Sequence, residues 1–209
     1  MNNNLTEIVL IVDESGSMRN LRDETIKGIN SFLDEQKTTP GDASVTIVAF
    51  NSNVRTIMRS ESLKRISHIT YEDYRPLGGT ALLDAVGSTI DRVGDRLRET
   101  PESERPSKVI IVIITDGEEN MSCNYSYERV KNMIQHQTDK YSWKFIFLGS
   151  NIDAKKCANT IGIQSDYAAS YTSSNRGVDS VYSSISCMTA EYKSCADSTI
   201  NTSLLSNIE

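Results

Sequence analysis

The apolar positions of this chain form two kinds of pattern. Residues 8–12 and 109–114 are unbroken β-branched and aliphatic runs, which is typical of strands buried on both faces in a parallel sheet. Residues 44–50 and 143–148 predict two further strands, and residues 167–171 predict a short last strand. The chain is therefore expected to contain a sheet whose central strands are fully covered.

Between the strands, apolar residues recur every three or four positions, which is the spacing along one face of an α-helix. Asp153 is expected to cap the start of a short helix, and Gly162 is expected to end it. The predicted helices cover residues 21–36, 82–100, 127–134, 154–161 and 178–188.

Strands that alternate with helices predict an α/β fold, with a doubly wound, mostly parallel sheet and helices on both faces. The turn at residues 51–53 is expected to join residues 54–59 to the preceding strand as a hairpin. This hairpin places one antiparallel strand at the sheet edge. Arg55 and Arg59 are then expected to be solvated residues that protect the edge from further pairing.

Length and charge narrow the class of protein. The chain has 209 residues, enough for one domain over residues 1–195, followed by a polar, loose tail over residues 196–209. A net charge of −6 disfavours a nucleic-acid partner, whose phosphates normally meet a basic patch. The first residues carry no basic segment, and the apolar run after them is too short to span a membrane. A cytoplasmic location is expected.

The cysteines do not predict a disulfide framework or a zinc site. No pair has C-x-x-C spacing, and His68 and His136 are isolated from the cysteines and from each other. Cys157 and Cys187 lie in apolar helical patterns and are expected to be small buried hydrophobic residues, with all thiols reduced. The four cysteines are Cys123, Cys157, Cys187 and Cys195.

Side chains with oxygen atoms follow the two most apolar strands. Asp13, Ser15 and Ser17 come after the first strand, and Asp116 follows the strand over residues 109–114. Thr80 follows a Gly-Gly pair directly before a predicted helix. Since the carboxyl ends of parallel strands lie at one sheet edge, three loops are expected to meet there. Hydroxyl and carboxylate oxygens suit a hard divalent cation such as Mg²⁺.

The order D-x-S-x-S, then G-G-T, then an apolar strand ending in T-D-G resembles the von Willebrand factor A family and its metal-ion-dependent adhesion site. The resemblance covers roughly residues 5–193, although only the three loops are specific. It implies that Ser15, Ser17 and Thr80 hold a cation directly, while Asp13 and Asp116 act largely through bound waters. The implied cation is Mg²⁺, or another divalent cation such as Mn²⁺ or Ca²⁺.

The resemblance also implies a function. A shell rich in neutral hydroxyls leaves the cation poorly neutralised, so a partner protein can complete the coordination with an Asp, Glu or C-terminal carboxylate. Without a signal peptide or disulfides, the chain is similar to the stand-alone intracellular members of bacteria and their phages, which serve as adaptors or assembly modules. The oligomeric state is not predicted.

Structural and enzymatic alternatives remain. Each of Asp13, Thr80 and Asp116 could be a helix cap or a turn residue. A metal-assisted hydrolase using the same carboxylates is the main functional alternative, and Glu14 is its one plausible general base.

Arg19, Tyr74 and Arg75 are surface candidates for partner contact. Other acids near the site, namely Glu14, Asp84, Glu118 and Glu119, are expected to be solvated.

Overall fold

The computed structural model describes residues 1–195 and 199–208. Its strands form one sheet in the order β3-β2-β1-β4-β5-β6, and every neighbouring pair is parallel except the β2–β3 hairpin at one edge. The mostly parallel sheet with one antiparallel edge strand is therefore confirmed. The strands are β1 (Asn2–Asp13), β2 (Asp42–Phe50), β3 (Val54–Ser62), β4 (Pro106–Thr115), β5 (Lys144–Ser150) and β6 (Ala168–Tyr171).

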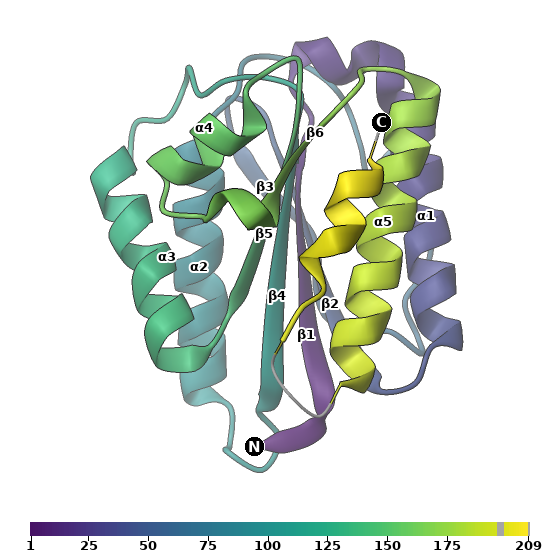
Figure 1. Cartoon of the computed structure of the whole chain (residues 1–209), viewed down its shortest axis with the longest axis vertical. Helices are drawn as coiled ribbons and strands as arrows, with labels where there is room; N and C mark the ends of the chain where they lie inside the picture. Colours follow the sequence, from purple (N-terminus) through teal and green to yellow (C-terminus); the bar gives the residue numbers. More distant parts are fainter. Residues whose placement is uncertain (196–198, 209) are drawn as a thin grey trace.

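Helices cover both faces of the sheet, as the alternating pattern predicts. Figure 1 shows α1 and α5 on one side and α2, α3 and α4 on the other. The helices are α1 (Arg22–Thr38), α2 (Leu82–Glu99), α3 (Tyr127–Tyr141), α4 (Ala154–Thr160) and α5 (Asn175–Ser194), with 3-10 helices η1 (Gly16–Leu21), η2 (Ser165–Tyr167) and η3 (Thr202–Asn207).

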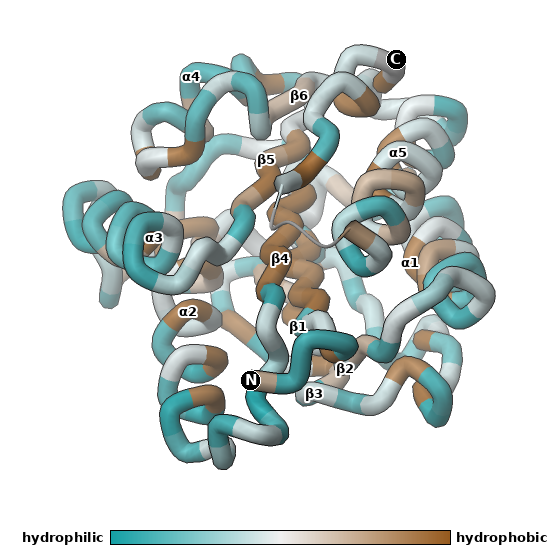
Figure 2. Tube along the Cα trace, turned by 60° about the horizontal axis from the view of Figure 1, so that its bottom comes forward, coloured by the Kyte–Doolittle hydropathy of each residue, from teal (hydrophilic) through white to brown (hydrophobic). Residues whose placement is uncertain are grey.

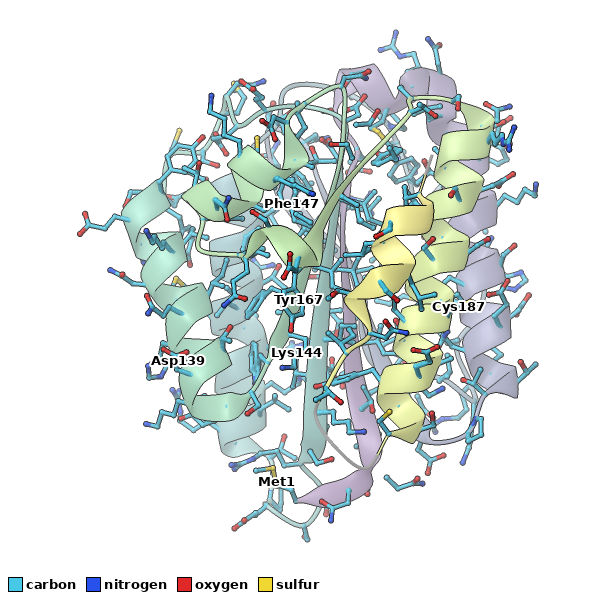
Figure 3. All side chains as sticks on the ribbon, in the orientation of Figure 1. Met1, Asp139, Lys144, Phe147, Tyr167 and Cys187 are labelled. Atoms are coloured by element: carbon cyan, nitrogen blue, oxygen red, sulfur yellow. The ribbon has the colours of Figure 1, made fainter. Side chains whose placement is uncertain are left out.

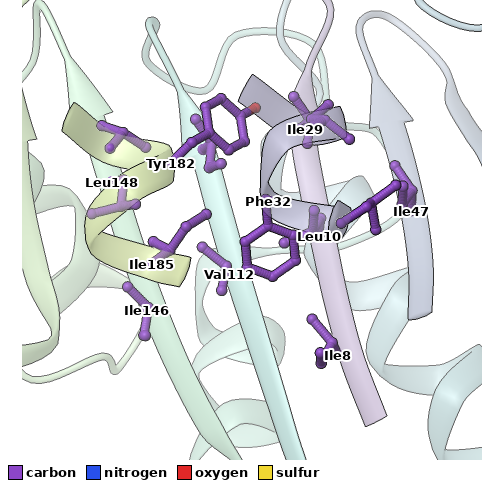
Figure 4. Close-up of a cluster of buried hydrophobic side chains, with 14 of the residues drawn as sticks. Ile8, Leu10, Ile29, Phe32, Ile47, Val112, Ile146, Leu148, Tyr182 and Ile185 are labelled. Atoms are coloured by element: carbon purple, nitrogen blue, oxygen red, sulfur yellow. The ribbon is translucent and has the colours of Figure 1, made fainter. Parts of the chain in front are cut away.

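Two apolar cores lie on the two faces of the sheet. Because side chains alternate along a strand, Leu10 and Val112 face α1 and α5, where they join Phe32 and Ile185 in the cluster of Figure 4. Alternate residues such as Val9 belong to the opposite core under α2 and α3. Between these cores, the central parts of β1, β4 and β5 are apolar, as the brown segments in Figure 2 show.

The parallel register brings the ends of β1, β2 and β4 to one edge of the sheet. Asp13 of β1 is level with Phe50 of β2, and Val12 is level with Ile114 of β4. The loops after β1 and β4 therefore start side by side, at the upper end of the molecule in Figure 1. This edge carries all the residues that the sequence predicts as cation ligands.

Two expectations differ from the structure. The expected loose tail covers residues 196–209, of which residues 196–198 and 209 lie outside the described part. In the described part, η3 packs on α5, with Leu205 only 6% exposed in the core cluster, and three apolar neighbours (Ile200, Leu204 and Ile208) pack against the same cluster. Cys187 is exposed on α5, not buried (Figure 3), because it lies on the helix side away from the core. Cys157 is partly buried.

In the described part of the chain, no helix combines the length and the apolar character that crossing a membrane requires.

Candidate functional site

The first loop of the site begins at the last residue of β1. Asp13 is fully buried, and its Oδ1 accepts a hydrogen bond from the backbone N–H of Ser15 at 2.7 Å. This bond turns the chain immediately after the strand, as short carboxylates commonly do in turns. The hydroxyl oxygens of Ser15 and Ser17 then lie 3.0 Å apart. The first loop thus gathers one carboxylate and two hydroxyls.

The second loop, after β4, is bonded directly to the first. The Ser17 hydroxyl donates to Asp116 Oδ1 at 2.6 Å. The Thr115 hydroxyl donates to Asp13 Oδ2, also at 2.6 Å. Thr115 is not among the predicted site residues, although its position at the end of a buried strand beside β1 is what lets it orient the Asp13 carboxylate.

The third loop places Thr80 against the second. A β-carbon on Gly117 would lie 3.3 Å from the Thr80 hydroxyl oxygen, so this hydroxyl lies against the backbone that follows Asp116. The loop is fixed on the first loop by a hydrogen bond from Gly16 N–H to the Gly78 carbonyl at 3.0 Å. Gly78 has a φ of +80°, which favours glycine at this position. Thr80 is not the N-cap of α2, since Ala81 occupies that position.

The two carboxylates of the site are buried without a basic partner. Asp13 and Asp116 form no ion pair with any lysine, arginine or histidine in the part of the chain that the structure describes. Burial, with a smaller contribution from Asp116, raises the pKa of Asp13 to about 6, although hydrogen bonds from Thr115 and Ser15 oppose the shift. Burial also raises the pKa of Asp116. Buried charges are normally paired or bound to a metal.

Glu14, expected to be solvated, is buried, and its carboxylate accepts hydrogen bonds from other residues. Its carboxylate accepts hydrogen bonds from Arg55 Nη2 at 2.9 and 3.1 Å and from the Arg75 backbone N–H at 3.0 Å. Its backbone carbonyl also accepts a hydrogen bond from Leu77 N–H at 2.8 Å. Arg55 is therefore not simply a solvated edge residue: it neutralises Glu14, which joins the first loop to the third.

Two more acids organise the second loop. Asp84 accepts hydrogen bonds from the backbone N–H groups of Cys123, Asn124 and Tyr125 at 2.9 to 3.1 Å. Glu119 accepts one from Leu83 N–H at 2.9 Å. The expectation that Asp84 and Glu119 are solvated is wrong, because both carboxylates satisfy N–H groups between α2 and the loop after β4.

Tyr74 is also not a surface residue. Its side chain is fully buried, and its hydroxyl donates to the Asp13 backbone carbonyl at 2.5 Å. Arg75, the neighbouring candidate for partner contact, pairs with Glu72 at 2.5 Å. The segment before the glycine pair is thus bonded to the end of β1 through Tyr74.

The five predicted residues form a donor set that fits a hard divalent cation. They provide three hydroxyls and two carboxylates, and all of their donor atoms are oxygens, which suits Mg²⁺, Mn²⁺ or Ca²⁺. The two unpaired carboxylates supply the negative charge that a cation would balance. No group of three or more His, Cys, Asp or Glu side chains in the described residues is placed to hold a metal. Three of the five ligands in the predicted cation site are instead hydroxyl side chains. The five ligands are Asp13, Ser15, Ser17, Thr80 and Asp116.

The sequence matches the von Willebrand factor type A domain family over residues 7–183. The match covers most of the chain, so this chain belongs to that family. A comparison with curated proteins gave no match.

Solved structures share the fold at low sequence identity. The proximal thread matrix protein 1 from the mussel byssus, with a zinc-occupied MIDAS motif, superposes with a TM-score of 0.62 at 15% identity, covering 91% of this chain and 47% of that one. The pilus adhesin SpaC from Lactobacillus rhamnosus GG gives 0.68 at 14% identity, covering 91% and 31%. The ArnB paralog VWA2 from Sulfolobus acidocaldarius gives 0.51 at 19%, covering 93% and 46%. The chain spans about half the length of the first mussel structures, 47 to 48%.

Proposed function

We propose that this chain is a protein-binding module whose partner supplies a carboxylate to a divalent cation held at the site. Ser15, Ser17 and Thr80 hold the cation through their hydroxyl oxygens, and Asp13 and Asp116 supply negative charge. When bound, the cation offers an electrophilic position that a carboxylate oxygen can fill. Mg²⁺ is the proposed cation, and the role is that of an adaptor or assembly piece.

One observation carries this proposal. Two buried carboxylates lie together at the end of the central strands, bonded to serine and threonine hydroxyls and to no basic side chain of the described residues. Such an arrangement is costly without a cation, because burial strips both charges of water. The zinc-occupied MIDAS of the mussel protein supports a divalent cation at the equivalent place in the family.

The proposal includes the absence of catalysis. A hydrolase using this site would need a general base free to accept a proton from water. Glu14, the candidate base, is buried and accepts hydrogen bonds from Arg55 and Arg75, so its oxygens are already occupied. This contact pattern favours a binding module over the hydrolase alternative.

Metal binding is tested by titration calorimetry with Mg²⁺. We expect one site in the wild-type protein and none in Asp13→Ala, because the substitution removes one of the two carboxylates. Equal Mg²⁺ binding by both proteins would overturn the assignment of the site.

Partner binding is tested with Ser17→Ala, which removes one hydroxyl from an exposed position in the first turn of η1. We expect the fold to be preserved and partner affinity to fall at least thirtyfold, about 2 kcal/mol. EDTA should reproduce this loss in the wild type. Ser194→Ala is the matched control, since this exposed serine, among the described residues, bonds only to carbonyls of its own helix, α5. If the partner still binds in EDTA and to Ser17→Ala, the binding surface lies elsewhere. If the purified protein hydrolyses phosphoesters in a way that depends on Asp116, the hydrolase alternative is favoured.

A further inference from the structure

Exposed apolar side chains are concentrated at the end of the molecule that carries the site. Four of the six large hydrophobic side chains found exposed among the described residues lie in loops or at a helix start at this end. The other two, Met1 and Tyr141, lie at the opposite end, where Figure 3 shows Met1. The four at the site end are Tyr71, Leu77, Met121 and Tyr127.

Leu77 and Met121 both lie beside the glycine pair of the third loop. Leu77 directly precedes the glycine pair that leads to Thr80. Met121 lies against the same pair, since a β-carbon on Gly79 would be 2.4 Å from Met121 Cγ. These two side chains, which we call the apolar rim, therefore flank the third loop of the site.

Backbone hydrogen bonds fix both residues of the apolar rim, while their side chains remain exposed. Leu77 N–H donates to the Glu14 carbonyl at 2.8 Å, and Met121 N–H donates to Glu119 Oε1 at 2.9 Å. With these anchors in place, the Leu77 side chain is 64% exposed and the Met121 side chain is 46% exposed. Apolar surface that is rimmed by polar residues marks interaction sites when it is grouped in one place, and Leu77 and Met121 flank the same glycine pair.

We infer that the apolar rim selects partners in which the metal-directed carboxylate is flanked by apolar side chains. This inference rests on the proposed function and adds the chemistry of the partner segment: an Asp or Glu next to residues such as Leu, Ile, Met or Phe. The carboxylate meets the cation, and the flanking side chains bury Leu77 and Met121.

The charge beside the apolar rim favours a partner segment with a single acidic residue rather than several acidic residues in a row. Glu118 is exposed on the same loop as Met121. A second or third carboxylate in the partner would be repelled by Glu118, whereas an apolar neighbour gains contact with the rim. The favoured interface therefore has the metal-bound carboxylate at its centre and apolar contacts around it, which exclude water from the centre as the surroundings of binding hot spots do.

The test uses three short synthetic peptides in excess Mg²⁺. One has a single Asp flanked by Leu, the second has the same Asp flanked by Gly, and the third has Asn in place of Asp with Leu flanks. We expect the Leu-flanked Asp peptide to bind the wild type about tenfold more tightly than the Gly-flanked one, as burial of one or two aliphatic side chains gives. The double variant Leu77→Ser, Met121→Ser should reduce this preference to less than twofold.

The controls separate the two levels of the proposal. Tyr141→Ser removes an exposed aromatic side chain at the far end and should keep the full preference for Leu flanks. An unchanged preference in the double variant, or equal wild-type affinity for both Asp peptides, would overturn the role of the rim while Mg²⁺-dependent binding persists. If the Asn peptide binds as well as its Asp counterpart, or if EDTA changes nothing, the proposed function itself fails.

Discussion

Acidic residues that look alike in the sequence have different roles in this molecule. Glu14 and Asp84 are both predicted to be solvated, yet both are buried and accept several hydrogen bonds. Their partners explain why the sequence does not predict this: Arg55 is 41 residues from Glu14, and Asn124 is 40 residues from Asp84. The proposed ligands could be named from the sequence because four of them follow buried strands and Thr80 follows a Gly-Gly pair, all within short, specific motifs.

Asp84 gives a prediction about stability and pH. Burial alone would raise the pKa of Asp84, but hydrogen bonds from Cys123, Asn124 and Tyr125 outweigh it and hold this pKa below its ordinary value. The ionised carboxylate therefore stabilises the fold above the ordinary pKa of about 4, and the contribution is lost as the pH falls through the lowered pKa.

We expect Asp84→Asn to lower the free energy of unfolding by about 1–3 kcal/mol at pH 7, since an amide cannot accept all of these bonds. Urea unfolding from pH 7 to pH 3 should show the difference between wild type and variant shrinking below about pH 4. Asp166→Asn serves as the control, because Asp166 lies in the short helix η2, away from this loop. A difference that grows toward acid pH would contradict the role given to the Asp84 carboxylate.

At the scale of the elements, periodicity predicted most of the structure. The central strands and all five α-helices lie where continuous apolar runs and helical spacing place them. What was missed depends on contacts between distant segments: η1 links the first loop to α1, and η3 packs on α5. Neither element is long enough to show a periodic pattern of its own.

Two helical glycines illustrate how packing decides the effect of one substitution. Gly28 lets α1 approach α5, since a β-carbon there would lie 2.1 Å from the Tyr182 ring. Gly94 on α2 has open space, with its nearest neighbour, Gln137 Nε2, at 3.9 Å. Intrinsic helix propensity alone would favour alanine at both positions.

We expect Gly28→Ala to destabilise the protein by about 1–3 kcal/mol, because the ring and the helix must move apart. Gly94→Ala, the matched substitution, should stabilise it by about 0.5–1 kcal/mol. Chemical unfolding of both variants checks this pair. Stabilisation by Gly28→Ala would mean that the α1–α5 interface yields to an added methyl group.

The whole molecule sets the geometry of the site before any partner is present. The sheet order places β1 between β2 and β4, so the loops after β1 and β4 meet, and the hairpin and α2 bring in the third loop. The hydrogen bonds that join the first two loops also bring two negative charges together, because Asp13 and Asp116 are both buried there. Proteins commonly give up stability at functional sites in this way.

Removing one of the two buried charges should therefore affect the stability of the protein differently with and without the cation. Asp116→Asn keeps an oxygen to accept the Ser17 hydrogen bond but removes one of two buried, unpaired charges. In EDTA, the variant should therefore be at least as stable as the wild type. In Mg²⁺ at 100 times its Kd, the wild type should gain about 2.7 kcal/mol, because the cation binds only the folded state, and the variant should gain almost nothing. Thermal unfolding of both proteins in EDTA and in Mg²⁺ measures all four values. An ordinary substitution costs about 1 kcal/mol. If the variant is less stable than the wild type in EDTA by more than this, Asp116 is chiefly a structural residue. If both proteins gain equally in Mg²⁺, the cation does not bind at the end of β4.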